Sequence, residues 1–212
     1  MKSGKSDLVS GAYVDFQIAC LKVLPRSFSK DGDRLFWTRN GELLGYAIKN
    51  VLKLGGRKKS LLRVMPGRVI LPSIDRFVVA DNFKLRREIY NIDERFTRSF
   101  LKKVEGPADA AEIVTYKAKV AYEAAIILEL GERCIMTLGQ LFHLIICQGN
   151  GEEGFLLNQG EVNTIYTLDC NGTLASVSVY WDSDRTGWHV QGGSHLTCGM
   201  LADARQVLSR AA

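Results

Sequence analysis

Three residues late in the chain have side chains that could bind zinc or form a nucleophile with its base. His189, His195 and Cys198 follow the spacing H-x5-H-x2-C. Imidazole nitrogens and thiolates are preferred zinc ligands, and a thiolate beside an imidazole is a nucleophilic pair. A structural zinc site needs four ligands, usually as two close pairs, and no second pair is apparent in the sequence. We therefore predict structural roles for these residues and expect no metal or other cofactor.

A second group, Asp182-Ser-Asp184-Arg-Thr186, directly follows an apolar segment. It resembles the first motif of the haloacid-dehalogenase-type phosphotransferases, in which the first aspartate attacks phosphorus and the second handles the proton. That family places a long α/β domain after the motif, whereas a short segment follows Thr186, and Gly187 replaces the usual apolar continuation. The same residues open like a calcium loop, but the twelfth position is Gly193 instead of glutamate. We favour a polar turn, because Asp, Ser and Gly suit turns for local reasons.

The clearest indication of function is an uneven distribution of positive charge. The chain has a net charge of +5, yet the segment from Leu43 to Ile74 contains no Asp or Glu. Its cations are Lys49, Lys53, Arg57, Lys58, Lys59, Arg63 and Arg68. Clustered Lys and Arg attract phosphate backbones, although a basic surface can also serve only solubility. The sequence favours a non-catalytic binding module for nucleic acid or another polyanion.

Two alternatives from other classes remain open. One is a small hydrolase or small-molecule binder whose pocket combines Asp182, Asp184, His189, His195 and Cys198. The other is a structural or oligomeric subunit, with a homo-oligomer formed through a C-terminal helix.

Composition indicates a globular chain with a sizeable core. It has 212 residues, of which 46% are hydrophobic, and no apolar run approaches the length of a membrane span. Five scattered cysteines suggest reduced thiols, and the first residues lack the apolar segment of a signal peptide. We expect a cytoplasmic protein without a membrane partner.

The elements that would position these residues are clearest in the second half. Apolar residues at steps of three and four predict a helix over Pro107–Leu130, and Thr137 with Gln140 forms a capping box before a second helix. Alternating residues around Asn171-Gly172 predict a hairpin of Glu161–Leu168 with Thr173–Trp181, followed by a strand at Trp188–Val190. Apolar residues between Leu201 and Ala211 predict a short terminal helix.

The first half is expected to mix strands and helices. Asn40-Gly41 predicts another hairpin, and the segment after the basic cluster should enter the core as a strand. The predicted class is α+β, with an antiparallel β-meander and hairpins packed on a helical hairpin. A soft boundary separates a basic region, 1–105, from the helical hairpin and meander, 106–212, and the two are also compatible with one continuous domain.

Overall fold

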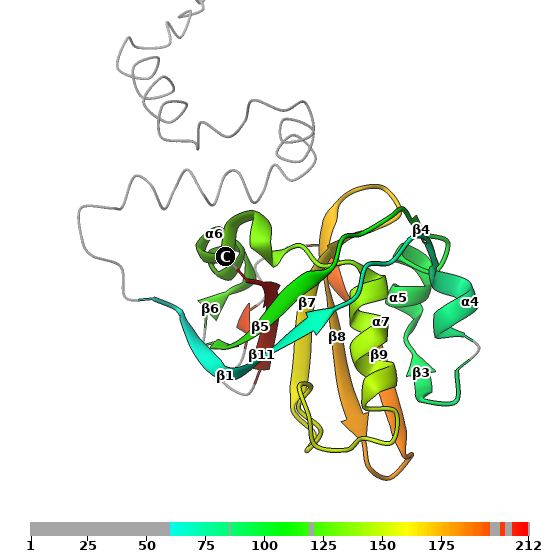
Figure 1. Ribbon diagram of the computed structural model, residues 1–212. Coiled ribbons are helices and arrows are strands. Elements are labelled where there is room, and N and C mark those ends of the chain that lie inside the picture. Colours follow the sequence, from blue (N-terminus) through cyan, green and yellow to red (C-terminus); the bar gives the residue numbers. More distant parts are fainter. Residues whose placement is uncertain (1–59, 85, 119–120, 196–199, 202–204, 212) are drawn as a thin grey trace, which may run out of the picture. The chain divides into compact units, whose positions relative to one another are not determined.

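The computed structural model describes residues 60–84, 86–118, 121–195, 200–201 and 205–211 (Figure 1). These residues belong to one compact unit, Lys58–Ala212. The hairpin predicted around Asn40-Gly41 lies outside them. Within the described residues, no helix is long and apolar enough to cross a membrane.

A mixed seven-stranded sheet is the centre of the fold, and its strand order is β1-β5-β11-β7-β8-β9-β3. The strands are β1 (Leu62–Leu71), β3 (Ile89–Ile92), β5 (Ala111–Ala118), β7 (Val162–Leu168), β8 (Leu174–Asp182), β9 (Gly187–His195) and β11 (Arg205–Arg210). Two pairs, β11 with β7 and β3 with β9, are parallel, and the other neighbours are antiparallel. Strands from both sides of residue 105 therefore enter the same sheet.

Four α-helices and two short strand pairs complete the described part of the chain. The helices are α4 (Val79–Phe83), α5 (Glu94–Ser99), α6 (Glu123–Leu130) and α7 (Leu138–Cys147), and the 3-10 helix η1 (Gly131–Cys134) follows α6. The short strands β2 (Phe77–Val78) and β4 (Val104–Glu105) pair with each other, as do β6 (Ala121–Tyr122) and β10 (Met200–Leu201). This content places the chain in the α+β class.

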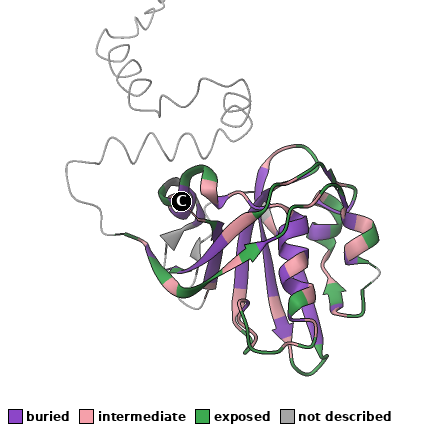
Figure 2. Ribbon diagram, viewed as in Figure 1, coloured by how far each residue is buried: buried purple, intermediate pink, exposed green. Residues whose placement is uncertain are grey.

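The main core lies between one face of the sheet and α4, α5 and α7 (Figure 2). We call this side the helix face. Its fully buried strand residues include Ile113, Ile165, Val177 and Val190. The opposite side, which we call the second face, carries the alternate residues, such as Tyr116, Thr164, Ser178 and His189.

In the second half of the chain, the predictions that depend on short-range contacts are confirmed. Thr137 Oγ1 accepts from the Gln140 amide at 3.1 Å, and the Gln140 side chain accepts from the Thr137 amide at 3.0 Å, so α7 begins with the predicted capping box. The β7–β8 hairpin has Leu168 opposite Leu174, and β9 follows as the third strand of the meander.

The helix predicted over Pro107–Leu130 is wrong in its first half, because Ala111–Ala118 forms strand β5. This strand lies between β1 and β11 and is buried on both faces, for example by Ile113 on one side and Val114 on the other. A strand buried on both faces lacks polar alternation, so its apolar residues also fit a helical period. The helix begins only at Glu123.

The terminal helix is also wrong, because Arg205–Arg210 forms β11 in the middle of the sheet. Val207 and Leu208 are adjacent and both fully buried, one on each face. The surface proposed for a homo-oligomer is therefore an internal strand.

Candidate functional site

Two of the predicted cations are described, and the structure separates their environments. Arg63 in β1 lies directly opposite Lys117 in β5, and both are exposed. Like charges in such a pair repel each other. Neither cation forms an ion pair with another described residue. We call Arg63 and Lys117 the basic pair.

Arg68, farther along β1, has an acidic partner. Its guanidinium contacts the Glu112 carboxylate at 3.2 Å, with side-chain exposures of 66% and 39%. This exposed contact is weak, but it reduces the local positive charge. The other predicted cations, Lys49, Lys53, Arg57, Lys58 and Lys59, lie outside the described residues.

The two aspartates of the proposed pocket belong to the β8–β9 turn. The Asp182 carboxylate accepts from the backbone amides of Asp184 at 3.0 Å and Arg185 at 3.1 Å. Thr186 has a positive φ of 52°, which completes the reversal of chain direction between β8 and β9. The described residues contain no group of three His, Cys, Asp or Glu side chains arranged to hold a metal.

His189 lies on the second face, beside two partners that its sequence position does not reveal. Its ring stacks on Tyr180 with 4.7 Å between centroids and 18° between planes, and Nδ1 is 2.9 Å from the Tyr180 hydroxyl. The Asn91 amide nitrogen donates to Nε2 at 3.4 Å. With the amide in this orientation, the neutral ring carries its proton on Nδ1 and donates it to the Tyr180 oxygen.

The charge state of this group follows from its surroundings. Desolvation lowers the pKa of His189, opposed by the negative charges of Asp93 and Asp182. The pKa of Tyr180 is raised by desolvation and by Asp182. Both pKa shifts favour the neutral forms of His189 and Tyr180. Neutral side chains suit hydrogen bonds and stacking contacts rather than an ion pair.

A register shift in β3 brings another aromatic ring to this group. Ile89 pairs with Trp188 and Asn91 with His189, so Tyr90 is the extra residue of a bulge. A side chain on Gly187 would come within 2.7 Å of the Tyr90 Cβ, so the missing side chain leaves room for Tyr90 on the second face. Bulges commonly redirect side chains in this way near sites. We call Tyr90, Asn91, Tyr180 and His189 the ring platform.

Of the remaining pocket residues, the described one, His195, lies away from the ring platform. His195 pairs with Ala175 at the far end of β9 from His189, and Cys198 lies outside the described residues. The described cysteines, Cys134, Cys147 and Cys170, are free thiols. Burial raises the pKa of Cys134 to about 12, so its thiol stays protonated and unreactive.

A buried polar cluster on the second face was missed by sequence reasoning. Glu123, at the start of α6, is 7% exposed, and Ser176 in β8 donates a hydrogen bond to its carboxyl. Desolvation raises the pKa of Glu123, opposed by Ser176 and by Arg205 of β11. The Tyr166 hydroxyl is buried near the same carboxyl, without a hydrogen-bond partner in the described part of the chain.

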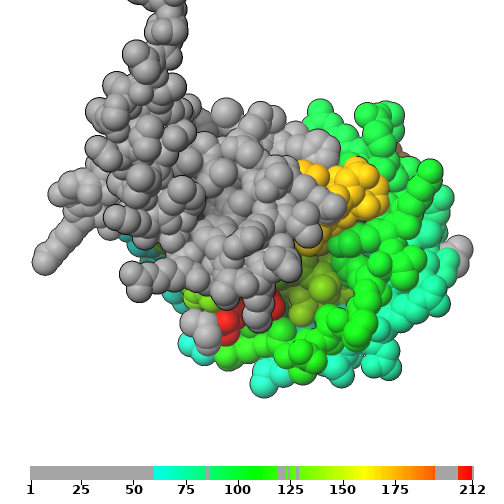
Figure 3. Space-filling model, turned by 90° about the horizontal axis from the view of Figure 1, so that it is seen from above, coloured from blue at the N-terminus to red at the C-terminus, as the bar shows by residue number. Residues whose placement is uncertain are grey.

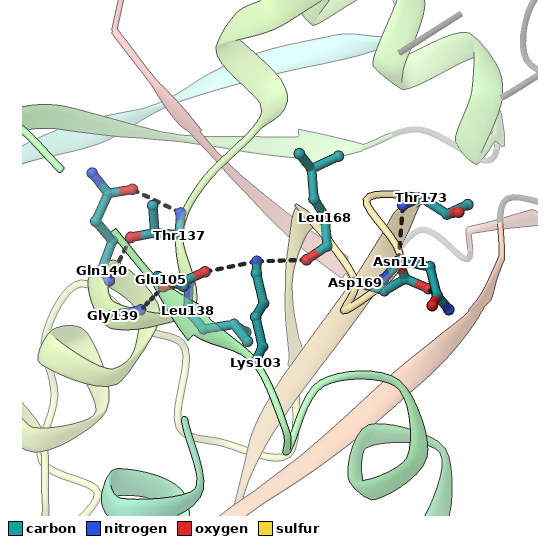
Figure 4. Close-up of polar contacts among 10 residues, drawn as sticks. All are labelled: Lys103, Glu105, Thr137, Leu138, Gly139, Gln140, Leu168, Asp169, Asn171 and Thr173. Carbon is teal, nitrogen blue, oxygen red and sulfur yellow. Dashed lines mark hydrogen bonds and ion pairs between the residues drawn. The ribbon is translucent and has the colours of Figure 1, made fainter. Parts of the chain in front are cut away.

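Another polar network lies at the opposite end of the sheet from the β8–β9 turn (Figure 4). The buried Glu105 carboxylate accepts from the Leu138 and Gly139 amides at 3.0 and 2.9 Å and contacts Lys103 Nζ at 2.8 Å. Lys103 also donates to the Leu168 carbonyl at 2.5 Å. In Figure 3 the adjoining β7–β8 turn, in yellow-orange, lies at the surface beside the green part of the chain. This network joins β4, β7 and the N-terminus of α7, which is a structural role.

Comparison with known proteins identifies no relative: no family model, no curated protein and no solved structure matches the chain.

Proposed function

We propose that the protein is a binding module for a polyanion, most directly a nucleic-acid backbone, and that the basic pair belongs to the binding surface. The observation that carries this proposal is the exposed pairing of Arg63 with Lys117 on adjacent strands, without an acidic partner among the described residues. Two unneutralised cations side by side repel each other, and phosphate oxygens relieve that repulsion.

The position of the basic pair in the chain also supports the proposal. Arg63 belongs to the acid-free segment of Leu43–Ile74, close in sequence to Lys58 and Lys59. Lys117 was not part of the sequence prediction, since it lies far away in the chain and reaches Arg63 only through the β1–β5 pairing. Lys117 therefore adds a cation from another strand to the positive charge of the acid-free segment.

A salt titration of oligonucleotide binding tests the proposal. Fluorescence anisotropy of a labelled oligonucleotide with the full chain should show affinity that falls linearly with salt on logarithmic axes. The double change Arg63→Gln and Lys117→Gln should weaken binding and reduce the magnitude of the slope by about 0.7–0.9 for each phosphate that the variant no longer neutralises.

Arg68→Gln is the matched control, because it removes a strand cation that already has Glu112 as its partner. It should change affinity less than either change in the basic pair. Absence of binding at low salt would refute the proposal. Equal effects of Arg68→Gln and Arg63→Gln would show that only total charge matters and remove the basic pair from the surface.

A further inference from the structure

The ring platform has the composition of a surface that contacts flat, polar, uncharged groups. Tyr90 is 46% exposed, Asn91 is exposed, and Tyr180 and His189 are partly exposed. The Arg185 guanidinium lies 5.3 Å from the Tyr90 ring centroid, which adds a second planar group. Gln191, in register with Ser178 on the same face, is exposed beside them. Aromatic faces and amide side chains therefore occur together on three adjacent strands.

Nucleobases match this combination better than phosphates do. Unpaired bases stack on Tyr, His and Arg planes, and their edges form hydrogen bonds with amides. Asp182 and Asp93 act electrostatically on His189, so negative charge at the platform opposes phosphate binding. With the Nδ1 proton of His189 donated to it, the Tyr180 hydroxyl is free to donate outward to a base carbonyl or ring nitrogen.

The strand registers place the ring platform and the basic pair near the same end of the sheet. One row of paired residues leads from Lys117 through Gln206 and Asn163 to Val179. Tyr180, the next residue after Val179, pairs with His189. The row crosses three strand spacings from Lys117 in β5 to β8, which is about 14 Å at about 4.8 Å per spacing, and Arg63 in β1 is six spacings, about 29 Å, from Tyr90 in β3. Because Lys117 alternates with Tyr116, the basic pair lies on the helix face, whereas the ring platform lies on the second face. A flexible single strand several nucleotides long would pass around this end of the sheet to contact both groups.

We propose that the ligand is a single-stranded nucleic acid whose bases stack on the ring platform while its backbone contacts the basic pair. The inference rests on the proposed polyanion binding and adds to it the class of polymer and the role of Tyr90, Asn91, Tyr180 and His189. A duplex hides its base faces and cannot use the platform.

The first test uses the wild-type full chain and three probes of equal charge: a single-stranded oligonucleotide, a single strand with abasic positions, and a duplex. We expect the strand with bases to bind about five-fold or more tightly than the abasic strand for each base that stacks. The duplex should bind no better than the abasic strand. Equal affinity for the single strand and the abasic strand would overturn the inference and leave the polyanion proposal standing, whereas no binding of any probe at low salt would refute both.

Variants of the platform provide the second test. Tyr90→Ala should weaken binding of the strand with bases about five-fold or more and leave abasic binding and the salt slope unchanged. Tyr90→Phe is the matched control, since it keeps the ring and should retain affinity. Melting curves of both variants show whether the fold is intact. If Tyr90→Ala and His189→Leu both fold and bind the strand with bases as the wild type does, the platform is not the base-binding surface.

Discussion

Glu123 is a carboxyl group that the fold keeps away from water. Its pKa is raised by desolvation above the ordinary value of 4.5, despite the hydrogen bond from Ser176 and the charge of Arg205. A group with a raised folded-state pKa stabilises the fold below its unfolded value, and this contribution is lost as pH rises through the folded value. The buried acid should therefore make the protein less stable as pH rises from 4.5.

Glu123→Gln should remove this part of the pH dependence. The free energy of unfolding of the wild type should decline, relative to that of the variant, between pH 4.5 and neutrality, because only the wild type must lose a buried proton. Urea denaturation at several pH values measures the difference. Glu94→Gln, at an exposed carboxylate that contacts Arg98, is the control and should follow the wild type. Parallel curves for Glu123→Gln and the wild type would contradict the expectation.

Glu105 carries a buried charge that is expected to contribute to stability. It is 7% exposed and joins the first amides of α7 to Lys103. Glu105→Gln should lower the free energy of unfolding by about 3 kcal/mol, because it removes one partner of a buried ion pair. Thermal or urea unfolding measures the loss, and Glu94→Gln should stay within about 0.5 kcal/mol of the wild type. A loss below about 1 kcal/mol would show that the network is not essential.

At the scale of elements, the contact between α5 and β9 depends on a position without a side chain. The Asp93 carboxylate caps α5 through the Phe96 amide at 2.7 Å and also accepts from the Gly192 amide at 2.9 Å. A Cβ at Gly192 would lie 2.5 Å from the Phe96 backbone nitrogen. The helix therefore packs directly on the strand backbone.

Gly192→Ala should destabilise the protein by about 2 kcal/mol, since the contact is with backbone that cannot move without shifting α5. Gly106→Ala is a matched control, because its Cβ would meet nothing within 4 Å and its φ is not positive. Urea denaturation midpoints compare the two variants. Equal stability would mean that α5 adjusts without cost.

Elements specified by nearby residues were predictable from the sequence. The capping box of α7 and the turn at Asn171-Gly172 depend on hydrogen bonds within a few residues. The strands β5 and β11 were not predictable, because each is buried on both faces by elements distant in the chain. Val207 and Leu208 satisfy a helical period as well as a strand, and only the neighbours β5 and β7 decide between them.

The candidate site was predictable only in part, because it also depends on contacts between residues that are distant in the chain. Composition identified Arg63 and Arg68 as cations, but the structure distinguishes them, because Arg63 pairs with Lys117 across the strands whereas Arg68 forms a diagonal contact with Glu112. His189 was selected for its chemistry, whereas Tyr90 and Asn91 reach it through a parallel pairing and a bulge. Single-sequence reasoning has no access to such long-range registers.

At the scale of the whole molecule, β11 holds the two parts of the sheet together. It pairs antiparallel with β5 on one side and parallel with β7 on the other (Figure 1). Removing residues 205–212 should therefore prevent stable folding, measured as loss of the cooperative melting transition. Removal of Ala211 and Ala212 alone is the control, since among the described residues it takes away the backbone hydrogen bond from the Ala211 amide to the Glu112 carbonyl and should cost about 1 kcal/mol. A cooperative transition in the longer deletion would contradict the central role of β11.

We expect the position of β11 to influence the order of events when the chain folds. The meander β7–β8–β9 joins neighbouring segments, whereas β5 pairs with a strand that comes much later in the sequence. Strand pairing over such separations must first overcome the entropy of loop closure, so it is expected to be slower than hairpin formation. Before β11 inserts, β5 and β7 each present an unpaired edge that accepts a strand from any chain. We therefore expect a refolding intermediate in which two molecules can exchange this strand, so that the yield of monomer falls as the protein concentration rises.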